Sequence, residues 1–451
     1  MDYRGRKILV IGLARAGRSA VKFLIEKGAR VIAVDMKKKE LLEGLDDIES
    51  MGAEVITGGY SKDLINGVDL VVKSPGVEMT DVIISKAVNK GISVIDELEL
   101  AYQNLSAKKV IAVTGTNGKS TVTSLIGHIL KGAGISSYIA GNIGDPLSAH
   151  ISEEAEFAVV EVSTFQLEAI DKFRPKIGVL LNITEDHLTR HKTMENYKEL
   201  KFRLFKNQRS DDIAILNRDD RYVWEGRRKV RSSVIPFSKE IFEGVGAWVN
   251  KEHIIVSIGN SPVKIIEVSK LPLLGPHNLD NYLATSLASY LAGASDKAIA
   301  EGIMTFKGLP HRMEFLGKIG GVDFYNDSKA TNPASMEMAL RSFDRDIVLI
   351  AGGRDKGTDF SYLRGLISGR VKAIVLIGEA RDKMAKEFNN VTKIIFSNDL
   401  DNAVRLAYRE AKGEGVVLLS PGCTSFDMFT DFEERGDRFR KVVNGLKRNI
   451  L

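Results

Sequence analysis

The chain has 451 residues, of which 44% are hydrophobic and 27% are charged, as is typical of a soluble globular protein. This length predicts about two to four domains with sizeable cores. The net charge of +5 suits small anionic ligands, but it is too small to indicate nucleic-acid binding. The single cysteine, Cys423, excludes an internal disulfide framework and indicates a reducing cytoplasm. Its simplest interpretation is a small buried residue.

The N-terminal region, residues 1 to about 98, alternates between expected strands and helices. A strand at Lys7–Gly12 begins almost at once, so we expect no signal peptide, and no apolar run is long enough to span a bilayer. The loop Gly12–Gly17 resembles a dinucleotide fingerprint, with Asp35 about 20 residues further on. Ala14 replaces the glycine that lets a pyrophosphate approach closely, which favours another nucleotide over NAD. A second loop at a strand end, Lys73–Gly76, is either a ligand contact or a simple turn.

The strongest motif begins the second region, residues 99 to about 307, where the apolar run Lys109–Val113 predicts a buried strand. A loop of small residues follows, and then apolar residues recur at helical spacing. Glycines in the loop let backbone N–H groups surround a phosphate, Lys119 supplies positive charge, and the Ser120 hydroxyl can bind Mg²⁺. Val113 stands where a common phosphate loop has its first glycine, so this loop is shorter than in GTPases and motors. A ligand-free turn is the alternative.

Three ionisable residues further along could complete an active site. Glu161 ends an apolar strand, where a second magnesium contact is usual, although an exposed glutamate at a helix start is the alternative. His187 follows the next apolar strand, and a single histidine is more often structural than a ligand. Lys201 shares the apolar face of a helix at Met194–Phe205. A lysine there either reaches a nearby carboxylate or is chemically modified.

The remaining chain supplies polar segments beside expected helices and strands. Asn278 and Asn281 precede an Ala-rich helix at Tyr282–Leu291, where they either cap the helix or contact a base edge. From about residue 308 a third unit contains apolar strands, three of which open into polar loops. These loops are Asn326–Pro333, Gly352–Phe360 and Ser420–Phe432. Since the carboxyl ends of parallel strands share one edge of a sheet, the three loops can form one site.

With these motifs in place, the chain resembles the Mur ligases, which are ATP-dependent enzymes of peptidoglycan precursor synthesis. The resemblance covers essentially the whole length and rests on TGTNGKST at 114–121, Glu161, His187, Lys201 and the HN and HR pairs at 277–278 and 311–312. The segments Asp327–Asn332 and Ser420–Gly436 resemble the members that add D-glutamate. The DNPR sequence of the members that add diaminopimelate or lysine is absent. Folate polyglutamate synthetases share the phosphate loop but lack the first domain.

The resemblance implies an α/β fold with three domains. These are a Rossmann-like domain at 1–98 that binds the UDP substrate, a central ATP-binding phosphate-loop domain at 99–307, and a Rossmann-like domain at 308–451 that binds the amino acid. It also implies a cytoplasmic reaction in which ATP and Mg²⁺ are used to join D-glutamate to UDP-N-acetylmuramoyl-L-alanine through an acyl phosphate. A monomer without nucleic-acid or membrane partners is expected.

The resemblance also assigns residues. Catalytic roles fall to Lys119, Glu161, His187 and Lys201. The metal ligands are Ser120, Glu161, His187 and Lys201 as a carbamate. The ATP contacts are Gly115, Thr116, Asn117, Gly118, Lys119, Ser120, Thr121, Asn278, Asn281, Arg312 and Asp327. The uridine nucleotide faces Arg15, Asp35, Ser74 and Gly76, and the muramoyl part faces Asn142, Ser163 and Gln166. D-Glutamate is surrounded by Lys329, Thr331, Lys356, Ser425 and Phe432.

Three other functions remain compatible with the sequence. Another Mur-type ligase would use the same mechanism with a different amino acid. A nicotinamide dehydrogenase would use the Gly12–Gly17 loop, and NAD(H) binding would reveal it. A non-catalytic nucleotide-binding module would bind ATP without substrate-dependent phosphate release.

Overall fold

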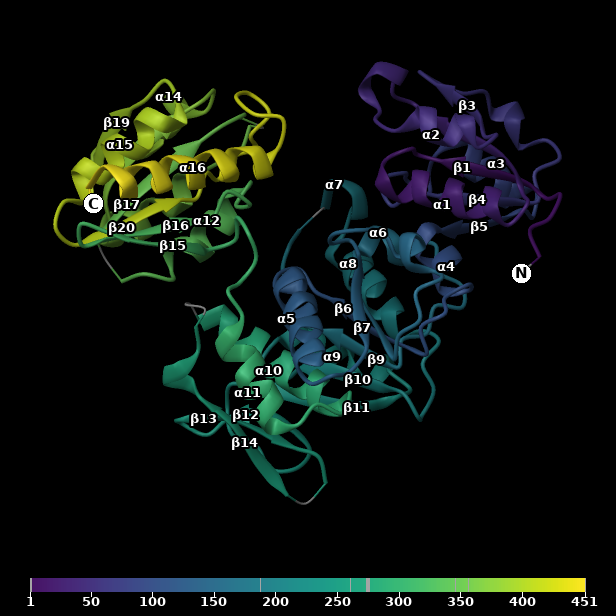
Figure 1. The fold of residues 1–451 in the computed structure, drawn as a ribbon, viewed down its shortest axis with the longest axis horizontal. Helices are drawn as coiled ribbons and strands as arrows, with labels where there is room; N and C mark the ends of the chain where they lie inside the picture. The colour runs from purple at the N-terminus through teal and green to yellow at the C-terminus, as the bar shows by residue number, and fades with distance from the viewer. Residues whose placement is uncertain are drawn as a thin grey trace. The chain divides into compact units, whose positions relative to one another are not determined.

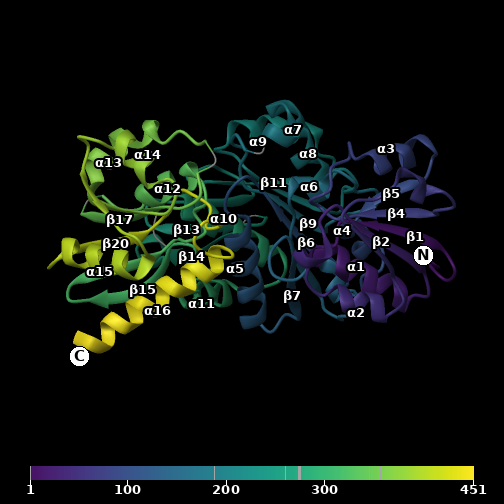
Figure 2. The ribbon, with the colours of Figure 1, turned by 90° about the horizontal axis from the view of Figure 1, so that it is seen from above.

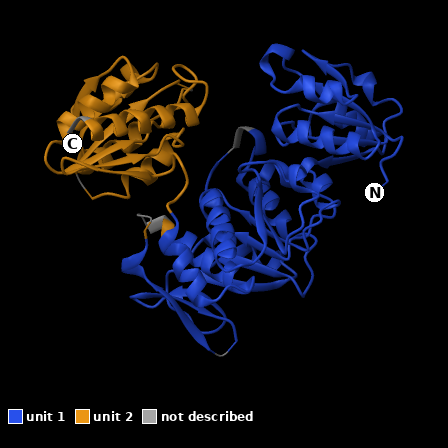
Figure 3. Ribbon diagram, in the orientation of Figure 1, with its two compact units in different colours: residues 1–271, 279–306 blue, residues 272–278, 307–451 orange. Residues whose placement is uncertain are grey.

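The structure is a computed structural model that describes residues 2–186, 188–259, 261–272, 276–344, 346–355 and 357–450. The predicted site residues His187 and Lys356 lie outside the described residues. The chain divides into two compact units, one of residues 1–271 and 279–306 and the other of residues 272–278 and 307–451 (Figure 3). The strands of the described residues form three sheets, which are labelled with their helices in Figure 1. An α/β fold with three domains, as predicted, is confirmed.

The first sheet of unit 1 is wholly parallel, in the order β3-β2-β1-β4-β5. Its strands are β1 (Lys7–Ile11), β2 (Arg30–Asp35), β3 (Glu54–Thr57), β4 (Leu70–Lys73) and β5 (Ser93–Asp96). Helices α1 (Arg15–Glu26), α2 (Leu45–Ser50) and α4 (Glu97–Tyr102) pack on one face of the sheet (Figure 2). Helix α3 (Val82–Asn89) packs on the other face, so both faces are covered. The strand order reverses between β1 and β4, and the two candidate nucleotide loops follow these two strands. Such a switch point is where open α/β sheets bind ligands.

The second sheet of unit 1 has the order β14-β13-β12-β11-β10-β9-β6-β8-β7. Its parallel strands are β6 (Lys109–Thr114), β7 (Ser137–Gly141), β8 (Phe157–Glu161), β9 (Ile177–Leu180), β10 (Ile213–Asn217), β11 (Ser233–Ser238) and β12 (Gly246–Val249). The antiparallel strands β13 (His253–Ser257) and β14 (Pro262–Glu267) extend it. Its helices are α5 (Lys119–Gly132), α6 (Thr164–Leu167), α7 (Leu188–His191), α8 (Met194–Phe202), α9 (Arg221–Gly226), α10 (Pro276–Leu291) and α11 (Asp296–Thr305). Strand β6 lies between β8 and β9, which brings their carboxyl ends to the phosphate loop.

Unit 2 contains the third sheet, in the order β15-β16-β20-β17-β18-β19. Its strands are β15 (Glu314–Ile319), β16 (Val322–Asn326), β17 (Ile347–Gly352), β18 (Val371–Ile377), β19 (Lys393–Phe396) and β20 (Gly415–Leu419), all parallel except β15. Helices α12 (Pro333–Leu340), α13 (Arg364–Arg370) and α14 (Arg381–Glu387) cover one face. Helices α15 (Leu400–Ala411) and α16 (Phe432–Ile450) cover the other face (Figure 2). Strands β16, β20 and β17 are neighbours, so the three polar loops that follow them meet at one edge, as predicted.

One expectation about local structure was wrong, and one strand was not predicted. Helix α10 begins at Pro276, so Asn278 and Asn281 lie inside its first turns rather than before it. Proline suits the first position of a helix because its fixed φ is helical and its missing N–H would have no helical partner. The sequence also gave no sign of β7, a short strand at the sheet edge, ahead of the polar turn at Gly141–Gly144. Within the described residues, no helix has the length and apolar character needed to cross a membrane.

Candidate active site

The phosphate loop connects β6 to α5 and depends on two glycines with positive φ. Gly115 has φ +157° and Gly118 has φ +86°. A Cβ atom on Gly118 would lie 2.3 Å from Oδ1 of Asn281 and 3.1 Å from a methyl group of Leu181. Any larger residue there would meet both a strained backbone and an occupied space. The loop therefore passes directly beneath α10, which places Asn281 at the rim of the phosphate site.

A second segment, at the end of β9, holds the phosphate loop in shape. The Thr116 amide donates to Asn182 O at 3.0 Å, and the Asn117 amide donates to Asn182 Oδ1 at 2.8 Å. The Thr116 hydroxyl accepts from the Thr184 amide at 3.0 Å and lies 3.1 Å from the Tyr197 hydroxyl. The roles of Asn182, Thr184 and Tyr197 as supports of the phosphate loop were not identified from the sequence. The feature that could have indicated the first two is the polar run directly after an apolar strand.

Lys119 and the two residues after it begin helix α5. The Lys119 ammonium donates to the carbonyl oxygens of Gly115 at 2.9 Å and Thr116 at 2.8 Å, so it folds back over the loop. Ser120 and Thr121 are each about 95% buried at the helix N-terminus, where unpaired N–H groups and the helix dipole favour an anion. The loop, the ammonium and the helix end together form a site for a phosphate chain.

Glu161 is the last residue of β8 and lies buried beside this loop. Its Oε1 accepts from Asn142 Nδ2 at 2.7 Å, while its Oε2 has no hydrogen-bond partner among the described residues. A buried carboxylate oxygen without a partner is costly, and a cation resolves that cost. Mg²⁺ prefers hydroxyl and carboxylate oxygens, so Ser120 and Glu161 fit this ion. The side chains of the described residues form no group of three or more His, Cys, Asp or Glu that could hold a metal by itself.

Lys201 lies on the buried face of α8, as predicted, and only 1% of it is exposed. Its ammonium lies 4.5 Å from the centre of the Tyr197 ring, and it forms no ion pair with a carboxylate of the described residues. Burial lowers the pKa of Lys201 well below its usual value, and the charge of Lys119 lowers it further. The nearby Asp186 carboxylate opposes this shift but does not reverse it. Burial and the nearby charge of Lys119 in the phosphate loop both favour the neutral, nucleophilic form of the Lys201 amine.

The first sheet brings two loops together at its switch point. Gly12 and Gly17 approach so closely that a Cβ atom on Gly17 would lie 1.7 Å from Gly12 O. The Asp35 carboxylate accepts from the Leu13 amide at 2.7 Å and from the Lys37 amide at 2.8 Å. Asp35 thus fixes the fingerprint-like loop itself. Arg15 is exposed at the start of α1.

The second loop of that sheet is attached to the other half of unit 1. Ser74 is buried, and Gly76 O accepts from Arg190 Nη1 at 3.0 Å. Arg190 also donates to the carbonyl oxygens of Pro75 and Val77 and forms an ion pair with Glu168 at 2.6 Å. Arg190 was not identified from the sequence, because nothing in its spacing indicates a contact with residues more than 110 positions away.

The residues predicted to contact the muramoyl substrate gather at the ends of β7 and β8. Asn142 follows β7, and its side chain donates to Glu161. Ser163 caps helix α6, and Gln166 completes a capping box by accepting from the Ser163 amide at 2.9 Å. All three lie along the same edge as Glu161 and the phosphate loop.

In unit 2 the described predicted residues lie on the loops after β16 and β20 and at the start of α16, except Arg312, which lies just before β15. The Lys329 ammonium lies 5.3 Å from the centre of the Phe432 ring. Ser425, which follows Cys423 by two residues, is buried. Asp327 accepts from the Ser420 hydroxyl at 3.0 Å, and burial raises the pKa of Asp327 to about 7. Arg312 and Thr331 are half-buried. Cys423 is buried as predicted, and burial raises the pKa of its thiol to about 12, which makes it unreactive.

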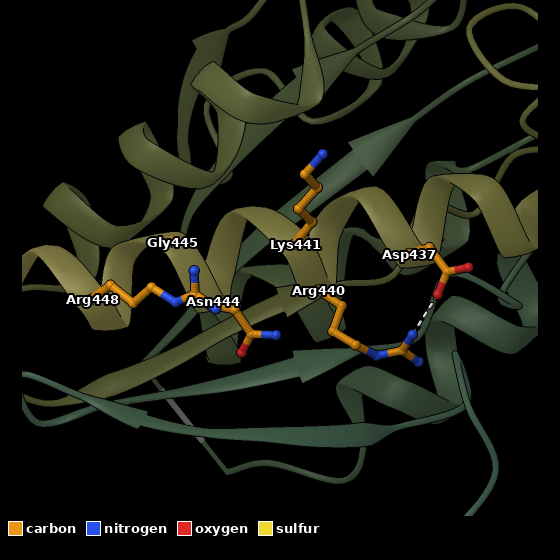
Figure 4. A pocket seen from close by; sticks show the side chains of 6 residues that line it. All are labelled: Asp437, Arg440, Lys441, Asn444, Gly445 and Arg448. Atoms are coloured by element: carbon orange, nitrogen blue, oxygen red, sulfur yellow. Dashed lines mark hydrogen bonds and ion pairs between the residues drawn. The ribbon is translucent and has the colours of Figure 1, made fainter.

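A surface pocket on α16 collects none of these residues. It is lined by Asp437, Arg440, Lys441, Asn444, Gly445 and Arg448, which all project from that one helix (Figure 4). Arg440 is held in an ion pair with Glu314 at 2.9 Å. Nothing in this pocket adds to the chemistry of the candidate site.

The fold and this phosphate site define a ligase that activates an acid with a nucleotide, and the chain belongs to the Mur ligase family. Family models match in three places, for the Mur ligase MurD-like N-terminal domain at 6–96, the Mur ligase middle domain at 113–289 and the Mur ligase glutamate ligase domain at 311–423. A relative from Thermoanaerobacter sp. (strain X514), named UDP-N-acetylmuramoylalanine–D-glutamate ligase, is 44% identical over 99% of this chain and 100% of its own length. The chain is therefore an enzyme, and its predicted membership of the Mur ligase family is confirmed.

Two solved structures show the same fold. The UDP-N-acetylmuramate–alanine ligase MurC from Thermotoga maritima has a TM-score of 0.60 at 19% identity, covering 97% of this chain and 99% of its own. The MurF ligase from Thermotoga maritima in complex with ADP has a TM-score of 0.57 at 17% identity, covering 98% and 96%. At these identities the likeness concerns the arrangement of strands and helices.

Proposed function

We propose that this enzyme joins D-glutamate to UDP-N-acetylmuramoyl-L-alanine with the hydrolysis of ATP to ADP and phosphate. The observation that carries the proposal is the full-length identity of 44% to a ligase of that name. The phosphate loop supports it, since the Lys119 ammonium folds over a glycine loop at a helix N-terminus and one oxygen of the buried Glu161 has no hydrogen-bond partner among the described residues.

The reaction needs two steps. A carboxylate oxygen of the muramoyl-L-alanine attacks the γ-phosphorus of ATP, and ADP leaves. The amine of D-glutamate then attacks the acyl phosphate carbon, and the tetrahedral intermediate expels phosphate while the amine loses its proton to solvent. Such chemistry depends mainly on positioning and on neutralising negative charge. Lys119 and the amides at the start of α5 supply positive charge to the transferred phosphoryl group.

Magnesium is the proposed cofactor beside ATP. When bound, the ion neutralises phosphate oxygens and orients them for transfer. Ser120 and Glu161 are described residues that would hold it, and His187 and Lys201 as a carbamate complete the proposed set. Asn142 donates to Oε1 of Glu161, which would leave Oε2 for the ion.

Lys201 is proposed to react with carbon dioxide and become a carbamate. The neutral amine forms a C–N bond to carbon dioxide and releases one proton, which gives a carboxylate on a lysine stem. Burial and the adjacent Lys119 favour the neutral amine that this reaction requires. The product would bring a negative charge close to Lys119 and would supply carboxylate oxygens for the magnesium ion.

The other contacts are carried over by motif. Asn278, Asn281, Arg312 and Asp327 are proposed to contact ATP. Arg15, Asp35, Ser74 and Gly76 are proposed for the uridine nucleotide, and Asn142, Ser163 and Gln166 for the muramoyl part. Lys329, Thr331, Lys356, Ser425 and Phe432 are proposed for D-glutamate. We also propose domains at 1–98, 99–307 and 308–451, and a monomer that works in the cytoplasm without nucleic-acid or membrane partners.

The test is phosphate release with ATP, Mg²⁺ and UDP-N-acetylmuramoyl-L-alanine against a panel of D- and L-amino acids. Release that depends on D-glutamate supports the proposal. Release with another amino acid would keep the mechanism and reassign Ser425, Phe432 and Lys329. ATP binding without release for any amino acid would favour a nucleotide-binding module, and calorimetry with NAD(H) tests the dehydrogenase alternative.

A further inference from the structure

Arg435 is the largest fully buried side chain among the described residues, and only 1% of it is exposed. It projects from the first turn of α16. Within the described part of the chain no carboxylate lies within ion-pair distance of its guanidinium, and its hydrogen bonds go to neutral oxygens. Burial lowers its pKa to about 10, so the group is still charged at neutral pH. The carboxylates of Asp427 and Asp327 oppose this shift from beyond ion-pair distance. A buried charge without a directly paired carboxylate is costly, which calls for a reason beyond packing.

The guanidinium joins the polar loops that follow neighbouring strands of the third sheet. Its Nε donates to Ser328 Oγ at 2.9 Å and its Nη2 to Ser328 O at 2.8 Å, both on the loop after β16. Its Nη1 donates to Cys423 O at 3.2 Å, on the loop after β20. The loop after β17 packs against the same group, since a Cβ atom on Gly353 would lie 3.3 Å from Nη1. One side chain therefore fixes three loops that are far apart in the sequence.

Each contact lies next to a residue proposed for the amino acid. Ser328 precedes Lys329, and Cys423 is two residues before Ser425. The Ser328 hydroxyl, which accepts from Arg435, donates in turn to Phe432 O at 2.9 Å. The guanidinium of Arg435 therefore anchors the segments that carry Lys329, Ser425 and Phe432, three of the residues proposed to contact D-glutamate.

We propose that Arg435 is the positioning residue of the amino-acid site, where it fixes the loops that carry Lys329, Ser425 and Phe432. This inference rests on the proposed function for the identity of the amino acid. Arg435 acts through the loops and does not itself touch the substrate. A planar guanidinium suits this role because it donates in three directions at once, which an ammonium on a flexible stem does not.

The test compares Arg435→Met and Arg435→Lys with the control Arg438→Gln. Arg438 lies on the same helix, but its side chain is 46% exposed and pairs with Asp401 on the surface. We expect Arg435→Met to raise KM for D-glutamate by at least about tenfold, the usual effect of losing one charge-assisted hydrogen bond. KM for UDP-N-acetylmuramoyl-L-alanine stays unchanged, Arg435→Lys falls between, and Arg438→Gln matches the wild type.

A second readout needs no substrate. Amide hydrogen exchange of the free enzyme should become faster at 327–332 and 420–428 in Arg435→Met and remain unchanged in Arg438→Gln. If Arg435→Met does not fold, Ser328→Ala takes its place, because it removes the hydroxyl that links Arg435 to Phe432.

The outcomes separate this inference from the proposed function. A folded variant with unchanged KM for D-glutamate and unchanged exchange would overturn the role of Arg435, as would equal increases in KM for all substrates. A wild-type enzyme that releases no phosphate with D-glutamate would overturn the proposed function, while the exchange rates would still decide whether Arg435 fixes the loops.

Discussion

At the scale of single residues, burial changes the chemistry that Lys201 can perform. Replacing it tests the proposed carbamate. Lys201→Ala should lose nearly all activity, and short carboxylates such as acetate or formate should restore part of it, because they can occupy the place of the carbamate. The measurement is phosphate release with and without added carboxylate. Lys206→Ala, which alters an exposed lysine in the same segment, serves as the control. Full activity of Lys201→Ala without rescue would rule out the carbamate.

The pKa of Asp327 gives a pH dependence of stability. Its pKa is about 7 in the folded protein because of burial, against an ordinary value of 3.8 in the unfolded chain. Between these values the folded state binds more protons, so this residue lowers the free energy of unfolding as the pH rises. Asp327→Asn can still accept from the Met313 amide and can donate to the Ser420 hydroxyl instead of accepting from it, and it should remove that loss, which amounts to a few kcal/mol at most. The check is calorimetry between pH 4.5 and 7.5, and parallel curves for the two proteins would contradict it.

At the scale of elements, the junction of β6 and α5 depends on the backbone of Gly118. We expect Gly118→Ala to destabilise the fold by about 1–3 kcal/mol and to abolish ATP-dependent phosphate release, since φ is +86° and Asn281 fills the space. Urea denaturation and ATP calorimetry measure the two effects.

The matched control for this prediction is Gly132→Ala, at the exposed end of the same helix. No atom lies within 4 Å of a Cβ there, so alanine should stabilise the helix by up to about 1 kcal/mol. If Gly118→Ala binds ATP as the wild type does, the phosphate loop does not have the role assigned to it.

At the scale of the whole molecule, a buried ion pair joins the neighbouring strands β4 and β5 of the first sheet, and its lysine also donates a hydrogen bond to helix α6 in the other half of unit 1. Lys73 and Asp96 are both fully buried, their charged atoms are 3.1 Å apart, and Lys73 also donates to Phe165 O at 3.3 Å. Lys73→Met should destabilise the protein by about 3 kcal/mol or more, because it leaves Asp96 buried without a cation. Adding Asp96→Asn, which keeps the cap on α4, should recover much of that loss.

Urea unfolding of the two variants at pH 5 and pH 8 checks this prediction. Burial already raises the pKa of Asp96 to about 6, and loss of Lys73 raises it further. The carboxyl is therefore protonated at pH 5, so Lys73→Met should be less destabilised there than at pH 8. A double variant that is as unstable as Lys73→Met at pH 8 would show that the ion pair is not the cause.

The sequence by itself determined the strands that precede most of the candidate site loops, the phosphate loop and the burial of Lys201, although it gave no sign of β7. Each of these follows from neighbours within one turn or one strand, such as the apolar run at Lys109–Val113 or the single face shared along Met194–Phe205. The meeting of three loops in the third sheet was also predictable, since parallel strands end at one edge. The individual site residues stay predictions until the ligands are measured.

Only the tertiary structure showed which residues hold these parts in place. Asn182 and Tyr197 support the phosphate loop, Arg190 holds the loop at 75–77, and Arg435 joins Ser328 to Cys423. The residues of the Arg435–Ser328 contact are 107 positions apart, and no local periodicity encodes a contact of that length. A hydrogen bond to a backbone carbonyl, moreover, leaves no mark on the identity of the partner residue. Such contacts therefore follow from the folded arrangement of the sheets.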